Sequence, residues 1–184
     1  MNPSPHGAGA PSAWVQRWTP LINPQGQVLD LACGQGRHMR WLQSQGLQCL
    51  GVDRDPVALQ AAQAFGEVLL ADLENQAWPL SKPFDAVVIT HYLWRALWPS
   101  ILASLKPGGV LIYETFAKGN ETVGKPSNPA FLLQPGELLE RCQGLRVVAF
   151  EDGFLPDPDR FIQRIAAVKP QAQTTSTVAF PLSR

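Results

Sequence analysis

The fold of this chain is decided by one stretch of its sequence, Val28-Leu29-Asp30-Leu31-Ala32-Cys33-Gly34-Gln35-Gly36-Arg37-His38. Its first four residues predict a short apolar strand that carries an acid, Asp30. Gly34 and Gly36 then predict a tight turn, and Met39 and Leu42 fall on one face of the helix that follows. Together these features predict a nucleotide-type site, because the glycines let the backbone approach a ligand and the helix N-terminus offers free N–H groups.

Length and composition narrow the class of protein. The chain has 184 residues, enough for one domain with a sizeable core. Apolar residues make up 45% and charged residues only 16%, which favours a sheet that is buried on both faces. Lys plus Arg and Asp plus Glu balance at 15 each, so no bulk positive charge is available to hold a polyanion. We therefore expect no nucleic-acid partner.

The cysteines and the hydropathy pattern bear on the compartment. Cys33, Cys49 and Cys142 are scattered and no metal-ligand spacing such as C-x-x-C occurs, so we expect neither a disulfide framework nor a metal site. No apolar run reaches about 18 residues, and the N-terminus has no signal-peptide core, so we expect no membrane partner. These features predict a reducing, cytoplasmic setting and leave the oligomeric state open.

Strand-like and helix-like patterns alternate along the chain. We expect helices at 36–45, 56–65, 93–105 (broken) and 135–142, after a first helix that Ser12 caps. None of the 17 prolines falls inside an expected strand. This alternation predicts an α/β, doubly wound and mostly parallel sheet whose last two strands form an antiparallel pair. The expected strands are 28–31, 47–53, 67–71, 85–90, 110–116, 145–151 and 160–168.

Composition also divides the chain into segments. Residues 1–11 are rich in Pro, Gly and Ala, so we expect a disordered N-terminus. Residues 12–169 form the expected folded domain, and residues 170–184 a flexible, Thr- and Gln-rich tail. Residues 117–134 carry Gly and Pro breakers and no clear element. A loop of this length is more often a binding segment than filler, so we expect it to cover the substrate.

The glycine turn fits two classes of cofactor, dinucleotides and S-adenosylmethionine. A dinucleotide fingerprint has a third glycine at the position where this chain has Met39. The carboxylate of Asp30 would repel a pyrophosphate, whereas it suits a ligand that carries an ammonium group and a sulfonium. Both residues favour S-adenosylmethionine over a nicotinamide or flavin cofactor.

Two further acids stand where strands are expected to end. Asp53 ends the second strand, where a carboxylate can accept both ribose hydroxyls. Asp72 follows the third strand and, with the backbone N–H of Leu73, can read an adenine edge. Each acid alone is explained about equally well as a helix cap or turn residue. Three acids at the ends of three consecutive strands, with Gly34 between them, favour a single cofactor crevice.

At these motifs the chain is similar to a known family. Residues 28–37 resemble motif I of the class I S-adenosylmethionine-dependent methyltransferases. The family's later motifs resemble Gly51-Val52-Asp53, Ala71-Asp72-Leu73, Phe84-Asp85-Ala86-Val87-Val88 and Leu105-Lys106-Pro107-Gly108-Gly109. The likeness covers about residues 25–168, and the Gly-Gln-Gly-Arg turn looks most similar to the small tellurite-resistance (TehB-like) type. Ala32 departs from the family's usual glycine, so we expect the turn to be kept with slightly less room.

The resemblance implies a Rossmann-like, seven-stranded sheet of order 3-2-1-4-5-7-6 with strand seven antiparallel. It also implies an enzyme that uses S-adenosylmethionine as its cofactor and transfers the methyl group by in-line displacement. With the residue arguments above, it selects as cofactor-binding residues Asp30, Ala32, Cys33, Gly34, Gly36, Arg37, Asp53, Arg54, Asp72, Leu73 and Thr90.

The acceptor side is expected at the ends of the fourth and fifth strands and in the long loop. His91, Tyr92 and Glu114 are the candidate catalytic residues, and Glu114 needs an explanation because it interrupts an apolar strand. His91 is equally well explained as a histidine hydrogen-bonded within its loop, and Tyr92 as a core residue. Arg95 is either a clamp for an anionic substrate or a solvated helix residue. The candidate substrate-binding residues are Trp94, Arg95, Phe116, Asn120 and Asn128.

Three functions are compatible with these residues. A methyltransferase that acts on a small molecule is favoured, since no Asn-Pro-Pro-Tyr or Asp-Pro-Pro-Tyr follows the fourth strand and the charge is balanced. A non-catalytic domain that binds S-adenosylmethionine and a protein partner is the alternative, because an intact site does not prove turnover. A nicotinamide-dependent oxidoreductase is disfavoured by Met39 and Asp30.

Overall fold

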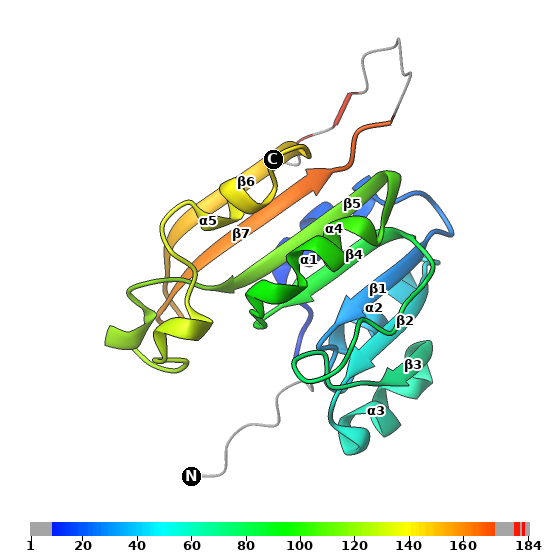
Figure 1. The fold of residues 1–184 in the computed structure, drawn as a ribbon, viewed down its shortest axis with the longest axis horizontal. Helices are drawn as coiled ribbons and strands as arrows, with labels where there is room; N and C mark the ends of the chain where they lie inside the picture. The colour runs from blue at the N-terminus through cyan, green and yellow to red at the C-terminus, as the bar shows by residue number, and fades with distance from the viewer. Residues whose placement is uncertain (1–8, 172–178, 181, 183–184) are drawn as a thin grey trace.

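The computed structural model describes residues 9–171, 179–180 and 182, and its centre is one seven-stranded sheet (Figure 1). The strand order is β3-β2-β1-β4-β5-β7-β6. The first five strands run parallel, and β7 is antiparallel to both β5 and β6. The predicted fold class and strand order are confirmed. The strands are β1 Gln27–Leu31, β2 Gln48–Asp53, β3 Glu67–Leu70, β4 Phe84–Thr90, β5 Leu105–Phe116, β6 Arg146–Leu155 and β7 Arg160–Val168.

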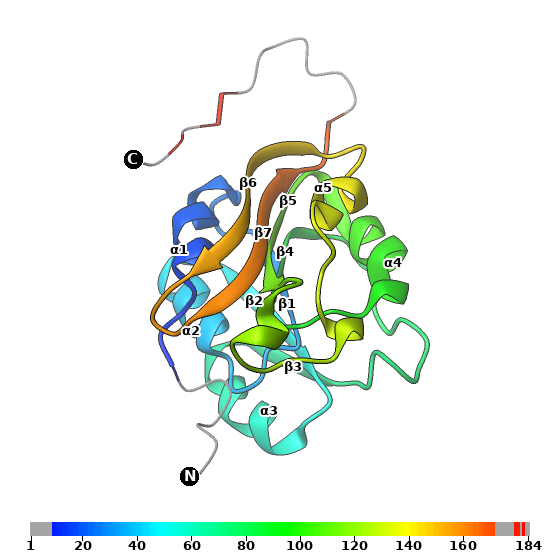
Figure 2. The ribbon, with the colours of Figure 1, turned by 90° about the vertical axis from the view of Figure 1, so that its left-hand side faces the viewer.

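Helices cover both faces of the sheet (Figure 2). On one face lie α1 (Ala13–Trp18), α2 (Arg37–Ser44) and α3 (Pro56–Ala62), and on the other α4 (Trp98–Ala103) and α5 (Glu137–Arg141). The apolar runs of the central strands follow from this layering, because alternate residues of one strand enter different cores. The short 3-10 helices are η1 Thr19–Leu21, η2 Gln63–Phe65, η3 Arg95–Leu97, η4 Asn120–Thr122 and η5 Pro129–Phe131.

Local chemistry fixes where the first helices begin. Ser12 caps α1 as predicted, since its hydroxyl accepts hydrogen bonds from the backbone N–H groups of Trp14 and Val15. The helix α2 begins after Gly36, whose φ is +77°. A Cβ atom at Gly36 would lie 3.0 Å from the Cα of Ala62, so this glycine also lets the turn approach α3.

The strand bounds differ from expectation by more than one residue at two places. The strand β5 begins at Leu105 rather than at residue 110, so Pro107, which lies before the expected strand, falls within the observed one. Leu105 pairs with Phe84 and Val110 with Ala86, so the stretch 106–109 interrupts the ladder between two regular pairs, where a proline costs no hydrogen bond. The strand β6 continues to Leu155 instead of ending at residue 151.

The predicted division of the chain stays a prediction at both ends. Most of the N-terminal segment 1–11 and of the tail 170–184 lies outside the described residues. Within the described part, residues 12–169 carry all the helices and strands. No helix among the described residues is both long and apolar enough to cross a bilayer.

Candidate active site

Asp30 is the most unusual residue at the carboxyl edge of the sheet. It is 1% exposed, and among the described residues its Oδ2 is one of two buried side-chain atoms without a hydrogen-bond partner. Burial raises the pKa of Asp30 to about 8, although the nearby charge of Arg37 opposes the shift. A buried carboxylate without a partner is costly, so this position suits a cationic ligand.

Asp53 holds the glycine turn in place. Its Oδ2 accepts a hydrogen bond of 2.8 Å from the backbone N–H of Gly34, and its Oδ1 accepts one of 2.9 Å from Asp55. The sequence predicts that Asp53 binds the ribose. In the structure the same carboxylate has a structural role as well, because it joins the end of β2 to the turn after β1.

The turn itself is left-handed at three positions. The φ values are +54° at Ala32, +54° at Gly34 and +77° at Gly36. Ala32 therefore keeps the backbone expected of a glycine, at a cost of about 1 kcal/mol for its Cβ atom. Cys33 follows Ala32 in the buried core, and burial raises the pKa of its thiol, so it is an apolar core residue and not a nucleophile.

Asp72 lies just after β3 and is held by its own loop. It accepts hydrogen bonds from the side chain of Asn75 at 2.8 Å and the backbone of Glu74 at 3.1 Å, and these lower its pKa. Leu73 beside it is buried, and Arg54 forms an ion pair of 3.9 Å with Glu74. The acids Asp30, Asp53 and Asp72 thus stand at the ends of the neighbouring strands β1, β2 and β3, as expected.

A buried histidine joins the N-terminal segment to this turn. The backbone N–H of Ser12 donates to His38 Nε2 at 3.2 Å, and His38 Nδ1 lies 3.4 Å from Thr90 Oγ1. Burial lowers the pKa of His38 to about 3, so the ring is neutral and carries its proton on Nδ1. Arg37 continues the chain of contacts, 3.5 Å from Thr90 Oγ1 and 3.4 Å from His91 Nδ1.

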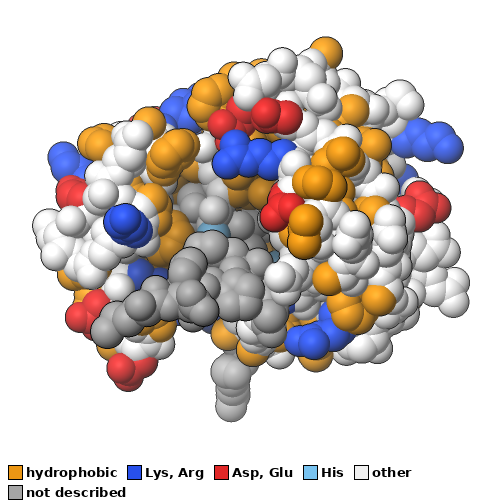
Figure 3. All heavy atoms as spheres, turned by 90° about the horizontal axis from the view of Figure 1, so that it is seen from below, with side chains coloured by type: hydrophobic (Ala, Val, Ile, Leu, Met, Phe, Trp, Pro, Cys, Tyr) orange, Lys and Arg blue, Asp and Glu red, His pale blue; other side chains and the backbone are white. Residues whose placement is uncertain are grey.

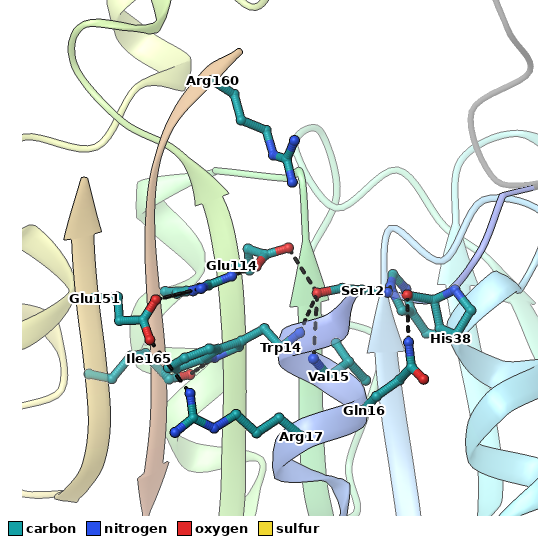
Figure 4. Close-up of polar contacts among 12 residues, drawn as sticks. Ser12, Trp14, Val15, Gln16, Arg17, His38, Glu114, Glu151, Arg160 and Ile165 are labelled. Carbon is teal, nitrogen blue, oxygen red and sulfur yellow. Dashed lines mark hydrogen bonds and ion pairs between the residues drawn. The ribbon is translucent and has the colours of Figure 1, made fainter. Parts of the chain in front are cut away.

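Glu114 has a structural explanation. Its Oε1 accepts a 2.9 Å hydrogen bond from the Ser12 hydroxyl, and its Oε2 forms a 3.2 Å ion pair with Arg164 (Figure 4). Arg164 also pairs with Glu151 and lies 4.7 Å over the ring of Trp14. Both oxygens of Glu114 are therefore engaged in tying α1 to β5 and β7, which leaves it poorly placed to move a proton.

A cavity of about 570 Å³ opens next to these residues. Seen from below, the molecule has Lys and Arg side chains beside a hollow in which histidine is visible (Figure 3). The predicted residues in its wall are Arg37, His91, Glu114, Phe116 and Asn120. Of the other polar residues in the wall, Lys125 belongs to the segment 117–134 that is expected to cover the substrate, and Ser12 is expected only as a helix cap. Arg160 and Arg164, which also line the wall, were not selected from the sequence.

The other predicted acceptor residues lie elsewhere. Arg95 donates to both carboxylate oxygens of Glu137 at 2.8 Å and to the carbonyls of Ala130 and Leu132, so it fastens the long loop to α5. Asn128 caps η5 by accepting from the N–H of Ala130. Trp94 and Tyr92 pack against the core on the α4 face, and neither belongs to the cavity wall.

The long loop is built into the cavity wall. Asn120 is buried; its side chain donates to the carbonyl of Pro126 and accepts from the N–H of Phe161, so its amide is used inside the fold. Val123, Gly124 and Lys125 line the cavity beyond it. Asn120 thus lies where expected but serves to shape the loop.

Comparison with known proteins fits this geometry. Residues 28–109 match the family model of a methyltransferase domain. A tRNA U34 carboxymethyltransferase of Pseudoalteromonas translucida is 33% identical over 138 residues, which are 64% of this chain and 43% of that protein. A malonyl-[acyl-carrier protein] O-methyltransferase of Serratia marcescens is 32% identical over 144 residues, 73% of this chain and 50% of that protein. The chain spans about half the length of the curated relatives it matches.

Solved structures agree with the sequence matches. TehB from Haemophilus influenzae has a TM-score of 0.73 at 21% identity, over 89% of this chain and 64% of that chain. The glycopeptide N-methyltransferase MtfA complexed with S-adenosylmethionine has a TM-score of 0.64 at 19% identity, over 92% of this chain and all of that one. By these matches the chain is similar to the class I S-adenosylmethionine-dependent methyltransferases, and it shares the fold of the solved ones.

These matches agree with the predicted family resemblance, enzyme class and cofactor. The likeness to TehB at 21% identity is a likeness of fold, and it agrees with the predicted branch. The expectation that nucleic acid is no partner gains no support, because two matched methyltransferases are named for tRNA U34.

Proposed function

We propose that this chain transfers a methyl group from S-adenosylmethionine to a small-molecule acceptor seated in the 570 Å³ cavity. The observation that carries the proposal is the buried, unpartnered Oδ2 of Asp30, which adjoins the glycine turn. A carboxylate in that state fits the ammonium group of the cofactor's amino-acid end. The glycine turn also connects the proposed cofactor site with the cavity, because Arg37, at the start of α2, belongs to the cavity wall.

The chain's own residues divide the work of binding. Asp30 would hold the ammonium group, Asp53 the ribose hydroxyls and Asp72 with Leu73 the adenine edge. Arg37 would face the cofactor's carboxylate, since its guanidinium lies beside Thr90 and His91 and, among the described residues, forms no ion pair with a carboxylate. The remaining proposed cofactor residues are Ala32, Cys33, Gly34, Gly36, Arg54 and Thr90.

When bound, S-adenosylmethionine supplies a methyl group on a positively charged sulfur, which a nucleophile displaces in line. Of the predicted catalytic residues, we retain His91 as the group that would accept a proton from the acceptor. It lines the cavity, and its ring lies 4.9 Å from the ring of Phe116, so it is held at the wall. Glu114 and Tyr92 are no longer proposed for this role, since the first is fully paired and the second lies outside the wall.

RNA is a second candidate acceptor, favoured by the relatives named for tRNA U34. The balance of 15 basic and 15 acidic residues argues against it, because RNA-binding proteins usually carry excess positive charge. The three cysteines are buried and unpaired, in keeping with a reducing, cytoplasmic setting.

One transfer experiment separates these acceptors. The chain is incubated with methyl-labelled S-adenosylmethionine and either a fractionated small-molecule extract or total tRNA. We expect label in a small-molecule fraction, with the His91→Gln variant at least about tenfold slower. Label only in tRNA would move the proposal to RNA, and no label in any acceptor, with cofactor binding intact, would favour the non-catalytic alternative.

A further inference from the structure

The cavity wall carries positive charges that no acidic side chain neutralises. Within the described residues, Arg164 is paired with Glu114 and Glu151, but neither Arg160 nor Lys125 has a carboxylate within ion-pair distance. Arg160 donates to the backbone carbonyl of Pro158 only, at 2.9 Å. Its guanidinium projects from the start of β7 toward the Glu114 side of the cavity (Figure 4).

Acidic residues of the same wall do not cancel these charges. Asp157 and Asp159 lie in the β6–β7 turn and are exposed, as Lys125 is, and among the described residues neither acid forms an ion pair with Arg160 or Lys125. Glu114 is buried, and its carboxylate forms an ion pair with Arg164. Arg160 is half-buried and stands between the bulk solvent and the cavity, where a charged hydrogen bond is stronger than in water.

Aromatic and apolar side chains make up another part of the wall. The rings of His91 and Phe116 lie 4.9 Å apart with an interplanar angle of 31°, and Val123 of the same wall is 39% exposed. An aromatic surface of this kind contacts the face of a planar group favourably. The cavity wall therefore offers aromatic surface as well as unpaired cations.

We propose that the acceptor is an organic anion, a carboxylate or phosphate on a flat apolar body, whose anionic group binds Arg160 and Lys125 and whose body lies against Phe116 and His91. This inference rests on the proposed function, because it takes the cavity as the acceptor site. It names the class of acceptor from the wall's chemistry: Arg recognises both carboxylate and phosphate through paired N–H donors.

Four probes test the charge and the flat body separately, in a ligand-observed NMR titration with S-adenosylhomocysteine present. Benzoate and phenyl phosphate carry both features, benzamide lacks the charge, and acetate lacks the ring. We expect benzoate or phenyl phosphate to bind at least about tenfold more tightly than benzamide and acetate, since a charged hydrogen bond contributes roughly 1.5–3 kcal/mol. Whichever of the two anions binds more tightly identifies the anionic group.

Variants assign the site. Arg160→Gln and Lys125→Gln should each weaken binding of the preferred anion severalfold or more, while Lys118→Gln, an exposed lysine of the same loop outside the cavity wall, should not. Equal binding of benzoate and benzamide, no binding of either anion, or unchanged binding in Arg160→Gln would overturn the inference. Calorimetry with S-adenosylhomocysteine is run on every variant, so a failure of the proposed cofactor site is seen separately.

Discussion

The hydroxyl of Ser12 donates a 2.9 Å hydrogen bond to Glu114, which lies 102 residues later in the chain. The same hydroxyl accepts from the backbone of Trp14 and Val15, and the Ser12 N–H donates to His38. One serine thus caps α1, pairs with a buried acid of β5 and reaches the helix after the glycine turn. The residues around Ser12 are therefore part of the cavity wall and also of the core that covers the sheet.

Removal of this serine should lower both stability and activity. Ser12→Ala loses an N-cap, worth about 1 kcal/mol, and leaves a buried carboxylate oxygen with one partner fewer, so we expect a loss of roughly 2 kcal/mol in denaturant unfolding. Ser44→Ala is the control, because its exposed hydroxyl bonds only locally, to the Trp41 carbonyl and the Gln45 side chain. Equal stability of the two variants would show that the Ser12 contacts carry no weight.

Asp30 should make the free protein less stable as the pH rises. Its folded pKa of about 8 lies above its ordinary value of 3.8, so the folded state holds the proton more tightly and stability falls between about pH 4 and pH 8. Asp30→Asn removes this loss, and its advantage over the wild type should grow across that range and then level off. Unfolding curves at several pH values measure it; parallel pH profiles for the two proteins would contradict the burial argument.

His38 should act in the opposite direction at low pH. Its folded pKa of about 3 lies below its ordinary value of 6.5, so the folded state resists protonation, and stability is lost as the pH falls from about 6.5 toward 3. Asp30→Asn should keep this acid-side loss while losing the alkaline-side one. A His38 ring seen by NMR to titrate near pH 6.5 in the folded protein would disprove the assignment of a buried, neutral ring.

Two arginines that share one acid provide a matched pair. Arg95 contacts Glu137 at 2.8 Å and is 32% exposed, whereas Arg141 contacts it at 3.4 Å and is 40% exposed. We expect Arg95→Met to cost roughly 2 kcal/mol, since it also leaves the Ala130 and Leu132 carbonyls without their donor, and Arg141→Met about 0.5 kcal/mol or less. A change in acceptor affinity without a loss of stability in Arg95→Met would restore the substrate-clamp interpretation.

The glycine turn carries a small, removable strain. Ala32 has a φ of +54°, so Ala32→Gly should stabilise the protein, by up to about 1 kcal/mol once the greater freedom of glycine in the unfolded chain is counted. The thermal unfolding midpoint measures the gain. A lower midpoint would mean that the methyl group of Ala32 makes packing contacts that outweigh the backbone strain.

The parts of the fold that depend on local pattern could be predicted from the sequence. The strand β4 reads as a continuous apolar run because both of its faces are covered, and the acids Asp30, Asp53 and Asp72 follow strands whose ends share one edge. The start of β5 could not be predicted, because Pro107 lies in an irregular stretch of that strand that the sequence pattern alone does not reveal.

The acceptor cavity could be predicted only in part, because partners far apart in the sequence decide it. Arg164 faces Glu114 through the antiparallel register of β5 and β7, and Arg95 meets Glu137 across 42 residues. Nothing near Arg95 in the sequence marks it as a structural anchor rather than a clamp. The antiparallel pair itself was expected, so the alternation of Arg160 and Arg164 along β7 was the one available signal that cations would line the site.

The central claim is that Asp30 holds the cationic end of S-adenosylmethionine. The most direct test is a calorimetric titration of S-adenosylhomocysteine into three proteins. This ligand keeps the ammonium group. The wild type should bind, and Asp30→Asn should bind at least about tenfold more weakly, since a charged hydrogen bond is lost. Glu67→Gln removes an exposed acid at the start of β3, where the amino ends of the parallel strands lie, away from the proposed cofactor site. This variant should bind as the wild type does. Equal affinity of the wild type and Asp30→Asn would contradict the account.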